Sequence, residues 1–140
     1  SIFPDRITEF EKLAFYQSDR FVGFAVLLVP TGRHSDRFAG MKVATLIEFN
    51  ALGAHIENAA AALNDYFLKK DTDAVITNVS HGHTYRCLKN GGFFERATNV
   101  YLATSKNLQA LLNERNIRLE DMVITRSDGD GPIGLGVDFR

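Results

Sequence analysis

The sequence has one cysteine, Cys87, and no tryptophan among its 140 residues. A single cysteine excludes a disulfide within the chain and suits a reducing compartment, so we expect a cytoplasmic protein. No apolar run approaches the roughly 20 residues of a membrane-spanning helix, and no basic stretch followed by an apolar one marks a secretory signal. We therefore expect no association with a membrane. The chain begins at Ser1 rather than at a methionine, which fits a processed, tagged or truncated piece with further residues upstream.

The sequence also has no large excess of positive or of negative charge. Lysine and arginine total 16, aspartate and glutamate total 17, and the net charge is -1. Proteins that bind nucleic acid usually carry a basic patch or stripe, so no nucleic-acid partner is expected. The composition, 45% hydrophobic and 24% charged, is typical of globular proteins, and the length suits one domain spanning residues 1–140.

The order of predicted elements defines the expected fold class. Strands are predicted where aliphatic and aromatic residues run together or alternate, at residues 13–19, 21–29, 41–49, 73–79, 93–103 and 122–125. Helices are predicted where apolar residues recur every three or four positions, at residues 54–70, 81–90 and 107–114. A hairpin followed by alternating helices and strands implies an α/β (α+β) domain, with a mixed, mostly antiparallel sheet flanked by helices.

Two of these predictions concern side-chain direction. In strand 41–49, alternation puts Ile47 and Phe49 on one face and Glu48 on the other. In helix 107–114, three leucines at helical spacing are expected to face inward: Leu108, Leu111 and Leu112.

Two stretches carry a family resemblance. The apolar strand 41–49 runs through a turn containing Gly53 into an amphipathic helix, and the sequence CLKNGGFFE spans Cys87 to Glu95. Together with the element order, they resemble the GNAT N-acyltransferase superfamily from its second strand onward, over roughly residues 13–125. The first strand and first two helices of that family have no obvious counterpart here.

The resemblance implies a cofactor site at the start of the helix that follows strand 41–49. In the family, the pyrophosphate of acetyl-CoA or another acyl-CoA lies on backbone N–H groups of a glycine-containing loop, as expected for an anion at a helix N-terminus. Gly53 matches the first loop glycine, whereas Asn50 replaces Gln or Arg and His55 replaces a small residue. Alternatively, Gly53 simply turns the chain into the helix. The residues implied to bind the cofactor are Ile47, Phe49, Asn50, Gly53, Ala54 and His55.

The resemblance also gives three candidate catalytic residues. Leu88 stands where the family has a tyrosine acid, and a leucine cannot protonate a leaving thiolate. Tyr85, one helical turn earlier, is the candidate acid. Glu48 and His81 are candidate bases. Two of these residues also fit a structural role, Tyr85 as a packing or capping residue and Glu48 as an exposed residue at a strand edge. The His81-x-His83 spacing lacks a third ligand, so no metal is expected.

Three functions follow from these residues. The first is an acyl-CoA-dependent N-acyltransferase that transfers an acyl group to a small-molecule or peptide amine by direct attack. The second is a non-catalytic GNAT-like binding or dimerisation module, which Leu88 and His55 favour. If the first strand and first two helices of the family are missing, an edge of the sheet is left unpaired, which favours a homodimer. The third is a thiol enzyme built on Cys87 and His83.

Overall fold

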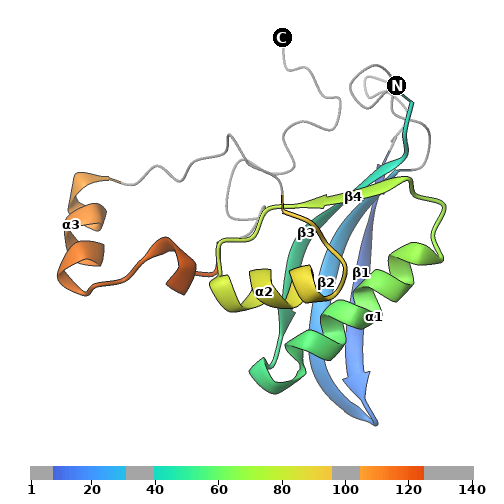
Figure 1. Cartoon of the computed structure of the whole chain (residues 1–140), viewed down its shortest axis with the longest axis horizontal. Coiled ribbons are helices and arrows are strands. Elements are labelled where there is room, and N and C mark those ends of the chain that lie inside the picture. Colours follow the sequence, from blue (N-terminus) through green and yellow to red (C-terminus); the bar gives the residue numbers. More distant parts are fainter. Residues whose placement is uncertain (1–7, 31–39, 96–104, 125–140) are drawn as a thin grey trace.

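The computed structural model describes residues 8–30, 40–95 and 105–124 (Figure 1). The elements follow the chain in this order: β1 (Thr8–Gln17), β2 (Arg20–Pro30), β3 (Val43–Ala51), the 3-10 helix η2 (Gly53–His55), α1 (Ile56–Leu68), β4 (Ala74–Thr77), α2 (Gly82–Asn90), α3 (Lys106–Glu114) and the 3-10 helix η3 (Leu119–Asp121).

The strands form a four-stranded sheet in the order β1-β2-β3-β4. β1 pairs with β2 and β2 with β3 in antiparallel fashion, whereas β3 and β4 are parallel because α1 carries the chain back between them. The described residues therefore confirm the α+β class and the mixed, mostly antiparallel sheet. In Figure 1, α1 and α2 lie against one face of this sheet, and α3 lies apart from it.

The main core lies between that face and the two helices. α1 buries the apolar stripe that its periodicity predicts, and Leu63 and Ala60 are completely buried. The stripe consists of Ile56, Ala59, Ala60, Leu63 and Phe67. Burying a leucine side chain stabilises the fold by roughly 1.5–3 kcal/mol. The sheet contributes residues of β2 and β3, and α2 contributes Cys87 and Leu88.

A bulge interrupts the alternation of β3. Leu27 pairs with Leu46, but the preceding residue Val26 pairs with Glu48, so Ile47 is the extra residue. A bulge shifts the side chains that follow it to the other face. Consequently Phe49 joins the core beneath the helices, while Ile47 packs with Leu28 in a separate cluster. The prediction that Ile47 and Phe49 share a face was wrong for this reason.

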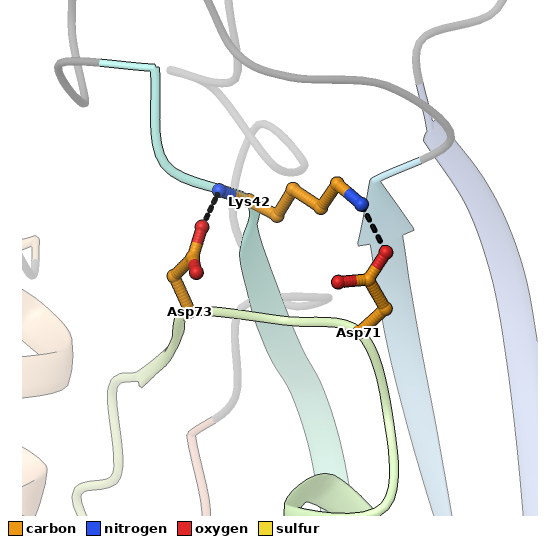
Figure 2. A network of polar contacts seen from close by, with 3 residues as sticks. All are labelled: Lys42, Asp71 and Asp73. Atoms are coloured by element: carbon orange, nitrogen blue, oxygen red, sulfur yellow. Dashed lines mark hydrogen bonds and ion pairs between the residues drawn. The ribbon is translucent and has the colours of Figure 1, made fainter.

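A polar network fixes the parallel register of β3 and β4 (Figure 2). The backbone N–H of Lys42 donates to the Asp73 carboxylate at 2.7 Å, and the N–H of Asp73 donates to the Lys42 carbonyl at 2.8 Å. The Lys42 ammonium is paired with Asp71. These contacts place Val43 beside Ala74 as the first residue pair of the two strands.

Other predicted boundaries differ from the structure. β1 begins at Thr8, well before predicted residue 13. Residues 93–95 and 122–124 are not in strands, and the rest of those two predicted strands, 96–103 and residue 125, lies outside the described residues. α3 buries none of its residues, and Leu108 and Leu111 are exposed, so the prediction that its leucines face inward was wrong.

Candidate functional site

The two parallel strands separate next to the helix that follows β3. Their last shared pair is Leu46 with Thr77, while β3 continues to Ala51. At that pair, the Thr77 hydroxyl donates a 3.0 Å hydrogen bond to the Leu46 carbonyl. The second half of β3 therefore has no partner on β4, and it runs directly into η2 and α1.

A small cavity occupies the separation. Its volume is about 20 Å³, about the space of a single water molecule. It is lined by the facing ends of the two strands, the start of α2 and a segment near the end of the described chain: Ile47, Phe49, Thr77, Asn78, Val79, His81, Thr84, Val123 and Ile124. A pantetheine arm does not fit in this volume.

Ser80 holds the segment that forms one wall of this cavity. Its hydroxyl lies 2.6 Å from the Met122 carbonyl, to which it donates, and it accepts a 2.8 Å hydrogen bond from the N–H of Ile124. Val123, between these two anchored residues, is 58% exposed and lines the cavity. Neither Ser80 nor Val123 was singled out from the sequence, because their role depends on a contact between residues more than 40 positions apart.

The N-terminal end of α1 carries no side-chain cap. No side chain caps η2 or α1, so the first backbone N–H groups lack the usual side-chain acceptor. A methyl group added at Gly53 would meet nothing within 4 Å. The implied cofactor residues Asn50, Gly53 and Ala54 are exposed here. Glu57 adds a negative charge in the first turn, where its carboxylate accepts a 3.3 Å hydrogen bond from Asn90.

His55 is half-buried and lines a second, larger cavity of about 330 Å³. This cavity lies between the β1–β2 hairpin and α1. Its lining comes from both elements: Ala14, Phe15, Tyr16, Gln17, Val22, His55, Asn58, Ala59 and Ala62.

Of the candidate catalytic residues, His81 lies at the strand separation. It is the N-cap of α2, where Nδ1 accepts from the N–H of Thr84 at 3.4 Å and lies 2.9 Å from the Thr84 hydroxyl. An accepting Nδ1 puts the proton of the neutral ring on Nε2. In this tautomer His81 presents a donor, not an acceptor, at its remaining nitrogen.

The structure does not bring Glu48 and Tyr85 to the same place. Tyr85 donates a 2.7 Å hydrogen bond to Glu95, and its oxygen accepts one from Lys89 at 3.3 Å. Glu48 is half-buried opposite Val26 in β2. Neither residue lines the cavity that His81 lines.

Cys87 and Leu88 belong to the core. Cys87 is 2% exposed, and its Sγ is 3.9 Å from both ring nitrogens of His83. Burial and the nearby charge of Glu57 raise the pKa of the Cys87 thiol. A protonated, buried thiol is a poor nucleophile, which argues against thiol chemistry.

Within residues 8–30, 40–95 and 105–124, no three His, Cys, Asp or Glu side chains converge as a metal site would require. None of the helices in these ranges is both long and apolar enough to cross a membrane. No known family model, curated protein or solved structure matches the chain. The function is therefore proposed from the fold and its geometry.

Proposed function

We propose that the chain is a GNAT-like, acyl-CoA-dependent N-acyltransferase that binds acetyl-CoA or another acyl-CoA where β3 and β4 separate. The observation that carries this proposal is the separation itself. β3 loses its parallel partner after Leu46 and then leads into the uncapped start of α1. The strand thus offers backbone groups to an acyl-pantetheine arm, and the start of the helix offers N–H groups to a pyrophosphate.

The anion site follows from the helix start. Unpaired N–H groups and the positive end of the helix dipole attract phosphate without any basic side chain. The open space at Gly53 lets a phosphate approach the backbone closely. Glu57 opposes this attraction with the negative charge that it places in the first turn.

The proposed reaction is a direct acyl transfer. A neutral amine of a small molecule or peptide attacks the thioester carbonyl, the C–S bond breaks, and the departing thiolate takes up a proton. His81, with its proton on Nε2, lines the separation and would donate a hydrogen bond to the departing thiolate in place of the missing tyrosine, while the proton that the amine loses passes to the thiolate. Glu48 and Tyr85 remain the other candidates, Glu48 to accept the amine proton.

The cavity must open for this function. Val123 and Ile124 form part of the wall of the cavity at the separation, and the described contacts that hold their segment include the Ser80 hydrogen bonds. A few hydrogen bonds of about 1 kcal/mol each can be exchanged when a ligand binds. Acyl-CoA binding is therefore expected to displace residues 122–124.

Thermal unfolding with acetyl-CoA and longer acyl-CoAs tests the proposal. A ligand at 100 times its dissociation constant stabilises the native state by about 2.7 kcal/mol. Gly53→Leu should leave the ligand-free melting temperature nearly unchanged and weaken binding, because its side chain would occupy the phosphate site. Val123→Ala should strengthen binding by removing part of the obstruction. The proposal fails if neither the unmodified protein nor Val123→Ala is stabilised.

The second candidate is a non-catalytic GNAT-like binding or dimerisation module. The small volume of the cavity, about 20 Å³, and the burial of Leu88 favour it. A protein of this kind would not bind acyl-CoA even as the Val123→Ala variant. Tight binding of acyl-CoA by a monomer would contradict this alternative.

A further inference from the structure

β1 is an edge strand of ten residues, and within the described part of the chain no strand pairs with its outer side. A long row of unpaired backbone groups is a template for pairing with another chain. We propose that β1 of a second copy occupies this edge in antiparallel orientation, with the two Leu13 residues facing each other across a two-fold axis. The dimer would join two four-stranded sheets into one. This inference does not depend on acyl transfer.

The two faces of β1 restrict how two copies can pair. Glu11, Leu13 and Phe15 face the helices, since Glu11 contacts Tyr66 and the other two pack against the core. Phe10 and Tyr16 have the opposite parity and are 64% and 63% exposed. Directly opposite residues must lie on the same face of the joined sheet. Residues on one face of β1 are all odd-numbered or all even-numbered. The two residue numbers of each directly opposite pair must therefore have an even sum.

Among the registers that remain, the one centred on Leu13 suits the side chains best. It pairs Phe10 of each copy with Tyr16 of the other, so two exposed aromatic residues cover each other on both sides of the axis. A centre at Lys12 or at Glu11 would put like charges directly opposite, which is destabilising. A centre at Ala14 would move Phe10 beyond the paired length.

The larger cavity lies beside the same edge. It runs between the second half of β1 and α1, with Phe15, Ala59 and Ala62 among its walls. The side chains of Gln17, His55 and Asn58 also line it, and none of the three has a hydrogen-bond partner among the described residues. In the Leu13-centred register, Glu9 of the second copy lies opposite Gln17. Its carboxylate would reach these amide and imidazole donors, so the cavity would accept the Glu9 side chain of the partner strand.

Engineered disulfides test the register directly. Residues directly opposite in antiparallel strands have Cα atoms about 4.5–5.5 Å apart, within the disulfide range. In a Cys87→Ala background, the double variant Phe10→Cys/Tyr16→Cys should form a covalent dimer on mild oxidation. Within one chain these positions are about 20 Å apart along the strand, so an intramolecular bridge is excluded.

The matched control is Phe10→Cys/Ala14→Cys, which would cross-link in the Lys12-centred register and should stay uncoupled. Sedimentation equilibrium supplies the second measurement. Tyr16→Lys should weaken the dimer by at least about tenfold, while Phe94→Lys, at a residue that is 94% exposed and outside β1, should leave it unchanged. Circular dichroism confirms that both variants fold. A protein that is monomeric at every concentration, or equal cross-linking of both double variants, would overturn the proposal.

Discussion

The Thr77 hydroxyl donates a 3.0 Å hydrogen bond to the carbonyl oxygen of Leu46 at the last residue pair of the parallel strands. The bond holds the two strands together immediately before they separate. Thr77→Val should remove it with little change in volume and lower the free energy of unfolding by about 1 kcal/mol. Urea denaturation monitored by circular dichroism measures the difference. An unchanged midpoint would show that the hydroxyl does not contribute.

Thr45 provides the opposite case on the neighbouring strand. Its side chain is completely buried, and within the described ranges its hydroxyl has no hydrogen-bond partner. A buried, unsatisfied hydroxyl costs about 1–3 kcal/mol. Thr45→Val should therefore raise the urea midpoint, whereas Thr77→Val lowers it. A loss of stability in Thr45→Val would mean that its hydroxyl is satisfied in solution.

The acid stability of the fold should depend on Glu11. Burial alone would raise its pKa, but hydrogen bonds from Lys70 and Tyr66 and the charge of Lys70 outweigh burial and lower the pKa below 4.5. A lowered folded-state pKa stabilises the fold above pH 4.5, and this contribution is lost as the pH falls through the lower value. Glu11→Gln should therefore flatten the acid part of a stability-versus-pH curve.

The ion pair between Lys70 and Glu11 is expected to contribute little to stability at neutral pH. Lys70 and Glu11 are 2.7 Å apart, and their side chains are 36% and 34% exposed, so solvent screens the pair. Lys70→Met should cost about 0.5–1 kcal/mol at neutral pH. Lys69→Met, on the adjacent exposed residue, is the control and should cost less. Equal effects of the two substitutions would show that the ion pair contributes nothing measurable.

Two glycines should respond in opposite ways to an added methyl group. A Cβ at Gly23 would lie 2.5 Å from the Asn50 carbonyl oxygen and 2.7 Å from the Ala51 Cβ, closer than real contacts allow. Gly23→Ala should therefore destabilise the β2–β3 pair by about 2–3 kcal/mol, as overpacking does. Gly53→Ala has open space and should be neutral or slightly stabilising. Melting temperatures of both variants provide the comparison.

The thiol of Cys87 should be unreactive in the native protein. Its side chain is buried, and its raised pKa keeps the sulfur protonated at neutral pH. Ellman's reagent should modify it slowly at pH 7.5 and quickly in denaturant. Fast modification of the folded protein would show that α2 opens readily.

Sequence patterns predicted the elements that are defined locally. The apolar run at residues 21–29 and the stripe of α1 correspond closely to Arg20–Pro30 and Ile56–Leu68, because burial of one face selects such patterns. The bulge at Ile47 could not be predicted, since it depends on how β2 and β3 align. α3 has the pattern of a buried helix but no buried residue, and periodicity cannot say which surface an apolar face meets.

Of the candidate site, too, only the locally defined part could be predicted from the sequence. A turn glycine followed by a helix is visible in the sequence, and Gly53 lies at that turn. The position of His81 at the strand separation, away from Tyr85 and Glu48, depends on where β4 ends. That end is set by non-local contacts, the Lys42 network at one end of the ladder and Thr77 at the other. The pattern of residue types along the sequence gives no information about such non-local contacts.

The strand order of the sheet has a consequence for folding. Neighbours in β1-β2-β3-β4 are also neighbours along the chain, so no strand must insert between two that are already paired. The β1–β2 pair closes a turn of two residues, the β2–β3 pair closes a longer loop between Pro30 and Val43, and the parallel pair can form only after α1. The sheet can thus grow one edge at a time as the chain leaves the ribosome, and β1 is the edge exposed longest.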